Sequence, residues 1–191
     1  VGSLHQEMIR KKFRGKKPKL TIKSVMYVGT NVHENSVHIP NNGLISSTYF
    51  ASQLKIYDLL ASLSDKLITV VKPNPQDRCT LGILQLPKFK RIRLETKKFE
   101  DTLQGIDLFI LDFPSTVLLS AISTSAHIFL LVEEGVSGLT TKQRNLLEKR
   151  VYIFENFDDL QNGIKKLVSC PETYPPKLND DYALSYSLHN I

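Results

Sequence analysis

The chain has 191 residues, 41% of them hydrophobic, and a formal net charge of +6. This length favours one domain with a full-sized core and short appendages. No apolar window is long enough to cross a bilayer, no signal-peptide pattern is present, and the two cysteines, Cys79 and Cys170, lack metal-ligand spacing. Membrane-spanning, disulfide-rich and zinc-binding classes are therefore excluded, and we expect a cytoplasmic protein.

Residues 1–22 are predicted to form a basic leader or an inter-domain linker. The basic side chains of this segment are Arg10, Lys11, Lys12, Arg14, Lys16, Lys17 and Lys19, and the rest of the chain is close to neutral. Charge runs usually face water, so a solvated flexible arm is one interpretation. The other is a peripheral contact with acidic lipids of the inner membrane. We predict no nucleic-acid partner.

Strand and helix patterns alternate from residue 23 onward. A buried strand at 23–30 ends in a glycine turn and precedes a long polar stretch at 31–47, which contains His33 and His38. Loops of that length are often functional, but the two histidines have no metal-like partners. A helix is predicted at 48–66, with Ser46 or Ser47 as its cap, because apolar residues recur there at steps of three and four.

The second half repeats this alternation. Strands are predicted at 66–76, 89–95, 107–111, 127–135 and 151–154, and helices at 97–105, 114–123, 140–150 and 156–169. Apolar strands separated by amphipathic helices indicate a parallel sheet covered on both faces. We therefore predict an α/β fold with a doubly wound parallel sheet, Rossmann-like, over 23–170. The tail at 171–191 is predicted to pack on this domain.

Ligands of open parallel sheets bind beyond the carboxyl ends of the strands, where three segments are candidates. In the segment 112–116, Asp112 ends a strand and Pro114, Ser115 and Thr116 begin a helix, whose free N–H groups favour an anion such as phosphate. The alternative is that Ser115 and Thr116 merely cap their own helix.

The other two candidate segments carry a lysine and a glycine. Two prolines stiffen the loop that follows Lys72 and contains Asn74, which suits a ligand contact, although an ordinary proline-rich turn would look the same. Gly29 and Thr30 follow the first strand, where glycine lets the backbone approach a ligand.

Two glutamates follow the strand predicted at 127–135. Glu133 could accept hydrogen bonds from ribose hydroxyls, whereas a solvated role for Glu133 and Glu134 is the alternative. No Ser-His-Asp order and no G-x-S-x-G elbow is present, which argues against a hydrolase of that type.

The motifs "VMYVGT", "ITVVKPNP", "DLFILDFPSTVLLSAIST" and "HIFLLVEE" together resemble the C-terminal, nucleotide-binding half of GT-B glycosyltransferases. Among these, the chain looks most like bacterial surface-polysaccharide transferases and CDP-glycerol glycerophosphotransferases. That family has a Lys-x-His-Pro loop and a later strand that ends in Asp-Tyr-(Ser or Pro)-Ser. The segments 72–75 and 112–116 match these motifs in order.

The resemblance implies that Ser115 and Thr116 hold the pyrophosphate of a nucleotide-sugar or CDP-linked donor, with Lys72 and the Gly29 loop nearby. Asn74 stands where the family usually has histidine, and Ser120 where it often has glutamate, so proton transfer at these positions is in doubt. The resemblance implies no required cofactor, although a divalent ion stays compatible with it.

The family's N-terminal half supplies the acceptor site, and we expect it to be missing from this chain, which alone would then be inactive. A sugar-nucleotide epimerase and a non-catalytic α/β interaction domain remain alternatives to a transferase.

Overall fold

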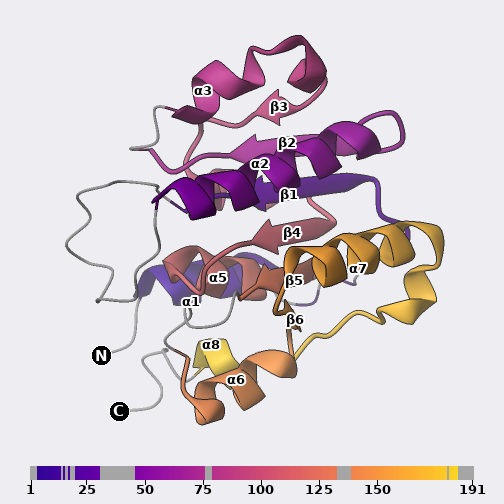
Figure 1. Ribbon diagram of the computed structural model, residues 1–191. Coiled ribbons are helices and arrows are strands. Elements are labelled where there is room, and N and C mark those ends of the chain that lie inside the picture. Colours follow the sequence, from indigo (N-terminus) through magenta and orange to yellow (C-terminus); the bar gives the residue numbers. More distant parts are fainter. Residues whose placement is uncertain are drawn as a thin grey trace.

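A computed structural model describes residues 4–13, 15, 17, 20–30, 46–75, 79–132, 139–179 and 181–184 (Figure 1). Its centre is a six-stranded sheet in the order β3-β2-β1-β4-β5-β6, and all five neighbouring pairs are parallel. The strands are β1 (Ser24–Val28), β2 (Ile68–Lys72), β3 (Arg93–Leu94), β4 (Leu108–Leu111), β5 (His127–Leu131) and β6 (Tyr152–Phe154). The predicted doubly wound, Rossmann-like fold is thus confirmed.

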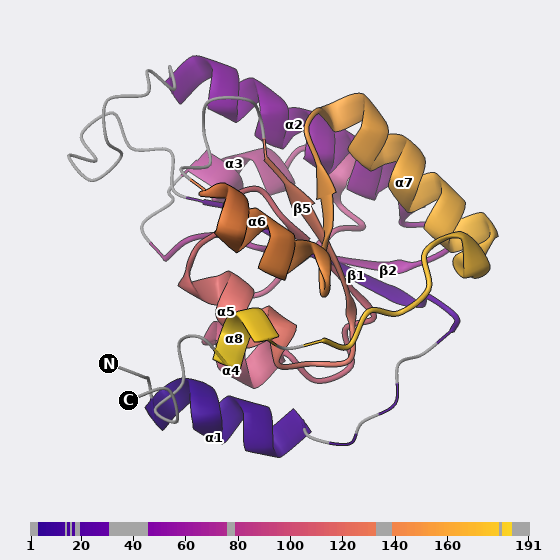
Figure 2. The ribbon, with the colours of Figure 1, turned by 90° about the horizontal axis from the view of Figure 1, so that it is seen from below.

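Helices cover both faces of this sheet (Figures 1 and 2). The α-helices are α1 (Leu4–Phe13), α2 (Ser46–Leu63), α3 (Cys79–Leu84), α4 (Phe99–Thr102), α5 (Thr116–Ile122), α6 (Thr141–Glu148), α7 (Phe157–Ser169) and α8 (Asp181–Leu184). Two 3-10 turns, η1 (Pro87–Phe89) and η2 (Pro171–Thr173), complete the elements. Among the described helices, none has the length and apolar character needed to span a bilayer.

The alternation of side chains along β1 creates two separate cores. All five residues of β1 are buried. Val25 and Tyr27 belong to one apolar cluster with residues of α2 and α7, whereas Met26 and Val28 belong to a second cluster with residues of α1 and α5. A strand buried on both faces favours apolar side chains, and the one polar residue of β1, Ser24, hydrogen-bonds to the carboxylate of Asp107.

Three described helices were not predicted, and several predicted ones differ in extent. The helix predicted at 48–66 is α2 (Ser46–Leu63), so Ser46 and Ser47 lie within it and the prediction that one of them caps it is wrong. Helix α1 lies inside the segment predicted as a basic leader, and α3 and α8 lie in stretches predicted as loop and tail. Helix α1 has few apolar residues, and only Ile9 and Phe13 anchor it in the core. The helix predicted at 114–123 begins at Thr116, since Ser115 is its extended N-cap, and α4 is shorter than predicted.

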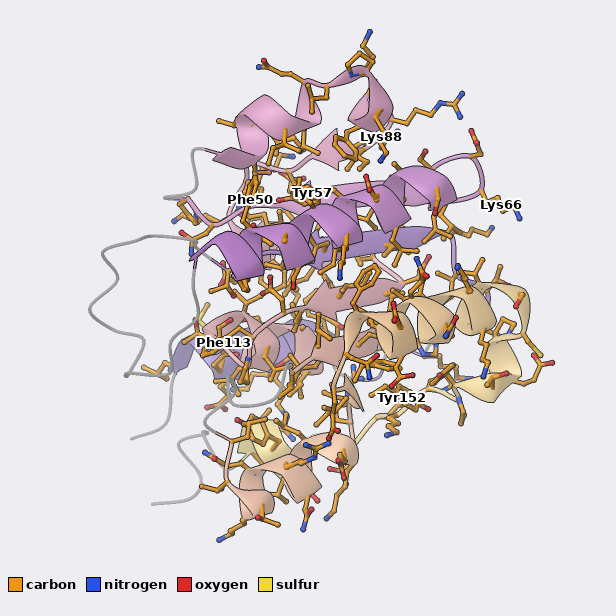
Figure 3. The ribbon with its side chains drawn as sticks, viewed as in Figure 1. Phe50, Tyr57, Lys66, Lys88, Phe113 and Tyr152 are labelled. Carbon is orange, nitrogen blue, oxygen red and sulfur yellow. The ribbon has the colours of Figure 1, made fainter. Side chains whose placement is uncertain are left out.

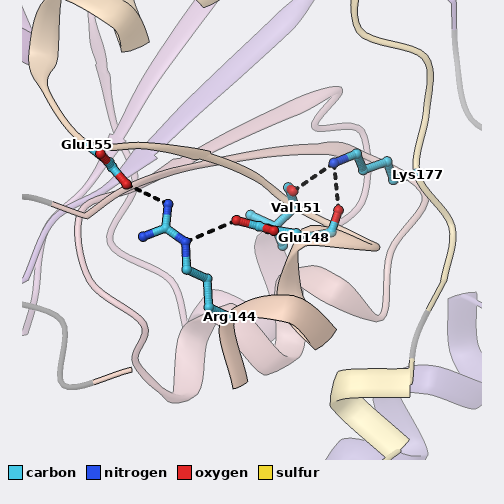
Figure 4. Close-up of polar contacts among 5 residues, drawn as sticks. All are labelled: Arg144, Glu148, Val151, Glu155 and Lys177. Carbon is cyan, nitrogen blue, oxygen red and sulfur yellow. Dashed lines mark hydrogen bonds and ion pairs between the residues drawn. The ribbon is translucent and has the colours of Figure 1, made fainter. Parts of the chain in front are cut away.

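The C-terminal tail packs against β6 and α6. The ring of Tyr174 contacts the rings of Phe129, Tyr152 and Phe154, with centroids 4.9–6.3 Å apart. The Nζ of Lys177 donates to the carbonyl oxygens of Glu148 and Val151 at 2.6 and 3.1 Å (Figure 4).

Helix α6 also has a network of ion pairs on its exposed surface. Arg144 pairs with Glu148 on α6 and with Glu155 just after β6, at 3.0 and 2.6 Å (Figure 4). These pairs connect α6 to the end of the outermost strand.

Candidate functional site

The carboxyl ends of β1, β2 and β4 lie side by side at one edge of the sheet. Val28 is in register with Lys72 on one side and with Leu111 on the other. The backbone N–H of Gly29 donates to the carbonyl oxygen of Lys72 at 3.2 Å. The three segments predicted to meet, which begin near Gly29, Lys72 and Asp112, are therefore adjacent.

Lys72 is the buried cation of this edge. It is only 6% exposed, and its side chain has no hydrogen bond or ion pair with any described residue. Side chains in register on parallel strands share a face, and Val28 and Leu111 both belong to the core on the α5 side. Lys72 therefore projects toward the layer that holds α5. Its Nζ is not among the buried polar atoms that lack a partner in the described residues, so the aliphatic stem is buried while the ammonium group reaches the surface, where it can meet an anion.

The start of α5 lies at the same edge. Ser115 is the N-cap, with φ of −91° and ψ of −178°, and its hydroxyl makes no capping hydrogen bond. Ser115 is half-buried, Thr116 is exposed, and the neighbouring Phe113 marks this edge in Figure 3. The capping alternative is therefore not realised by Ser115, and both hydroxyls remain available to a ligand.

Asp112 makes contacts on the opposite face of the sheet, toward α2. Its carboxylate accepts hydrogen bonds from the hydroxyls of Tyr27 and Tyr49, and from the backbone N–H and the hydroxyl of Thr30. The Oγ1 of Thr30 lies 2.8 Å from one carboxylate oxygen. Both oxygens are occupied, so Asp112 orients the loop after β1 instead of offering a free acceptor to a ligand.

Burial dominates the ionisation of this cluster. It raises the pKa of the Asp112 carboxyl above its ordinary value, and the hydrogen bonds from Tyr27, Tyr49 and Thr30 offset part of that effect. Burial, and next the Asp112 charge, raise the pKa of Tyr27 and of Tyr49. Both phenols therefore stay protonated and serve as hydrogen-bond donors at neutral pH.

Gly29 is required here by close packing. A Cβ at this position would lie 3.0 Å from Nε2 of Gln53 and 3.3 Å from the hydroxyl of Tyr27. The same Nε2 donates to the carbonyl oxygen of Thr30 at 3.1 Å. The glycine thus lets α2 approach the end of β1 and hold Thr30 from a second side.

The predicted site residues divide into three groups. The first group lies at the edge on the α5 side and consists of Lys72, Pro114, Ser115 and Thr116. The second supports the loop after β1 and consists of Gly29, Thr30 and Asp112. The third is Asn74, which is half-buried and follows β2. Glu133 and its neighbour Glu134, like His33 and His38, lie outside the described residues. The contribution of each residue to ligand binding stays a prediction.

Sequence reasoning missed Tyr27, Tyr49 and Gln53, which together orient Thr30 and Asp112. A signal was present, because a tyrosine in a buried strand or on the buried face of a helix needs a partner for its hydroxyl. Tyr57 shows the same rule, since it lies between α2 and the sheet and its hydroxyl is 2.8 Å from that of Thr80 (Figure 3). Which partner each hydroxyl takes depends on the crossing of α2 over β1, and that geometry is not readable locally.

No metal centre is formed by the part of the chain that the structure describes. Within these residues, no group of three or more histidine, cysteine, aspartate or glutamate side chains could hold an ion. The site is therefore defined by a buried lysine, two hydroxyls and a helix start.

Comparison with known proteins identifies the fold. No protein-family model and no curated protein sequence matches the chain. Among solved structures, the C-terminal domain of a glycosyl transferase group 1 family protein (LpcC) from Francisella tularensis is similar, with a TM-score of 0.53 and 10% identity over 98% of this chain and 96% of that domain.

A second similar structure is that of accessory secretory protein 1, 2 and 3 in Streptococcus pneumoniae, with a TM-score of 0.52 and 10% identity. The alignment covers 92% of this chain and 33% of that one, so this chain spans about a third of its length. At such identity the likeness establishes the fold alone, which is that of the C-terminal half of GT-B glycosyltransferases.

Proposed function

We propose that this chain is the donor-binding domain of a glycosyltransferase or a related nucleotide-activated group transferase. The observation that carries the proposal is Lys72, a buried lysine without a described partner, on the sheet face where α5 begins. A nucleoside diphosphate would supply the missing negative charge. The fold supports the proposal because it is that of GT-B C-terminal halves.

In this proposal the diphosphate of the donor binds between Lys72 and the start of α5. The hydroxyls of Ser115 and Thr116 donate to phosphate oxygens, and the free N–H groups of the first helical turn add a favourable dipole. When the bond to the transferred group breaks, negative charge builds on the leaving diphosphate, and Lys72 stabilises it electrostatically.

The proton that the acceptor hydroxyl loses needs a base from elsewhere. Asp112 is enclosed by Tyr27, Tyr49 and Thr30, and Asn74 cannot accept and return a proton. A second, acceptor-binding domain would supply this group, as in GT-B enzymes. We propose bacterial surface polysaccharide synthesis, with nucleotide-sugar or CDP-linked donors, as the setting.

A thermal-shift panel of UDP, CDP, GDP, CMP and ADP tests this proposal. We expect at least one nucleoside diphosphate to raise the melting temperature of the wild type, because a ligand that binds only the folded state stabilises it. Lys72→Met should remove most of the shift, and the Ser115→Ala/Thr116→Ala pair should reduce it.

Lys90→Met is the matched control, since Lys90 is exposed and lies outside this edge. It should respond as the wild type does. A wild type that no nucleotide stabilises, or a Lys72→Met variant that keeps the full shift, would contradict the proposal.

A second candidate is a non-catalytic α/β domain that uses the same fold for binding. The enclosure of Asp112 favours it, because the carboxyl whose pKa burial raises has no free oxygen with which to act on a substrate. The same thermal-shift panel distinguishes the two candidate functions, since the second predicts that no nucleotide changes the melting temperature of any variant.

A further inference from the structure

Helix α1 has an outward face that combines apolar and basic side chains. Leu4 and Met8 are each 70% exposed, and Leu20, a short distance along the chain, is 72% exposed. These are the most exposed large apolar side chains in the described part of the chain. Isolated exposed leucines are ordinary, but a group of this kind on one segment indicates an interaction surface.

The opposite face of α1 attaches the helix to the domain. Ile9 and Phe13 are 6% and 5% exposed and belong to the core on the α5 side. At about 100° per residue, Leu4, Met8 and Lys11 fall on the side of the helix away from these two anchors. The outward face is therefore held in place and cannot turn inward.

The charge of the protein is concentrated in the same segment. Residues 1–22 contain seven lysines and arginines and one acidic residue, Glu7, so this segment carries a net +6, which equals the net charge of the whole chain. Glu7 pairs with Lys11 at 3.1 Å, and Lys12 and Lys17 are exposed. The remaining residues, 23–191, contain equal numbers of basic and acidic side chains and are therefore neutral overall.

We propose that the outward face of α1, defined by Leu4, Met8 and Lys11 and bordered by Lys12, whose Nζ lies over the ring of Phe13, binds the surface of a bilayer that contains anionic lipids. Cations attract the headgroups, and the aliphatic side chains enter the boundary between headgroups and acyl chains. A nucleic acid would use the cations but would gain nothing from two exposed aliphatic side chains, so a lipid surface fits better.

The position of α1 gives this surface a direction. In Figure 1, α1 begins on the side of the sheet toward which the strands point, and Gln6 of α1 donates to the hydroxyl of Ser120 on α5 at 3.3 Å. A bilayer on the outward face of α1 would therefore lie along the layer that holds α5, on the face of the sheet toward which Lys72 projects (Figure 2). The inference itself is independent of the proposed nucleotide site.

Co-sedimentation with vesicles tests the inference. We expect the wild type to pellet with vesicles of 70% phosphatidylcholine and 30% phosphatidylglycerol, to stay in solution with pure phosphatidylcholine, and to detach as the ionic strength rises, because salt screens the attraction. A short DNA duplex serves as a competitor. It is added at the same concentration of negative charge as the anionic vesicles, and it has no apolar interior for the aliphatic side chains to enter.

Two double variants separate the two contributions. Lys11→Gln/Lys12→Gln should lower the partition coefficient on anionic vesicles about 30-fold, because each lysine near such a surface contributes about fivefold. Leu4→Gln/Met8→Gln, which keeps every charge, should lower it at least about tenfold, because even partial burial of two such side chains contributes that much. The matched controls are Lys90→Gln/Lys97→Gln and Leu81→Gln/Leu86→Gln, all exposed elsewhere, and both should bind as the wild type does.

Several outcomes would overturn the inference. Failure of the wild type to pellet with anionic vesicles is one, and equal losses in the control variants are another. A third outcome is that Leu4→Gln/Met8→Gln keeps full binding and the DNA duplex displaces the protein completely. This result would show that the segment binds polyanions in general. Unchanged melting temperatures of the variants ensure that lost binding reflects the surface itself.

Discussion

Asp112 shows how the polar atoms of a predicted site residue can be engaged by neighbouring side chains. The sequence places Asp112 at the end of a buried strand, within the segment 112–116 that is predicted to contact a nucleotide. The structure shows its carboxylate enclosed by Tyr27, Tyr49 and Thr30 on the α2 side of the sheet. Its carboxylate therefore holds the loop after β1 in place.

The pH dependence of stability should report the burial of Asp112. Because the folded-state pKa is raised, the unfolded chain loses the proton first, so the wild type should lose stability relative to Asp112→Asn as the pH rises from about 4 through the folded-state pKa. This trend is opposite to that of a salt-bridged aspartate. Urea denaturation at a series of pH values measures it.

Asp101→Asn is the matched control for this experiment, because Asp101 is exposed on α4. Its stability relative to the wild type should not show the same trend. A wild type that gains stability over Asp112→Asn across this pH range would contradict the assigned direction of the pKa shift.

At the scale of elements, the sequence predicted the strands and helices whose apolar residues recur at a regular spacing. The strands β1, β2, β4 and β5 are largely apolar and almost wholly buried, and the predicted helix at 156–169 is α7, which Asn156 caps by accepting from the backbone N–H of Asp159 at 2.8 Å. Helix α1 was missed because two apolar anchors in a basic segment make no readable period. Such a helix gains most of its stability from packing, which only the tertiary structure reveals.

Gly163 provides a test of packing between α7 and β6. A Cβ at this position would lie 2.7 Å from two ring carbons of Phe154, whose ring also packs on Phe129. Alanine is the better helix former by about 1 kcal/mol, yet we expect Gly163→Ala to lower the free energy of unfolding by about 2 kcal/mol, because the ring has little room to move. Chemical denaturation measures the change.

The same substitution at Gly82, within α3, is the control. A Cβ there meets no atom within 4 Å. Gly82→Ala should therefore raise the free energy of unfolding, by about 0.5–1 kcal/mol from helix propensity alone. Equal effects of the two substitutions would show that the contact with Phe154 does not limit position 163.

For the whole molecule, the parallel sheet followed from the alternation of strands and helices, and the meeting of three segments at one edge followed from the general rule for parallel sheets. The strand order is visible only in the structure. The sequence did not show which of the predicted site residues face the α5 layer and which face the α2 layer. Lys72 faces α5 whereas Asp112 contacts residues of α2 and β1, because side chains of successive strand positions point to opposite faces. Assigning these faces requires the exact register and strand ends.

Tyr174 joins the tail to the body of the domain. Its ring packs on Phe129, Tyr152 and Phe154, so we expect Tyr174→Ala to lower the free energy of unfolding by about 2 kcal/mol and to increase the binding of a hydrophobic dye. Calorimetry and dye fluorescence measure the two effects. Thr173→Ala, at an exposed neighbouring position, should change neither, and a Tyr174→Ala variant as stable as this control would contradict the packing role.

The central position of β1 also dictates an order of events during synthesis. The strand pairs with β2 along one side and with β4 along the other, in register from Val25 with Leu108. A growing chain can pair β1 with β2 soon after Lys72 leaves the ribosome. The other edge of β1 stays open until Leu111 has emerged, and an open apolar edge is a template for wrong pairing. One edge of β1 therefore stays unpaired between these two points of synthesis.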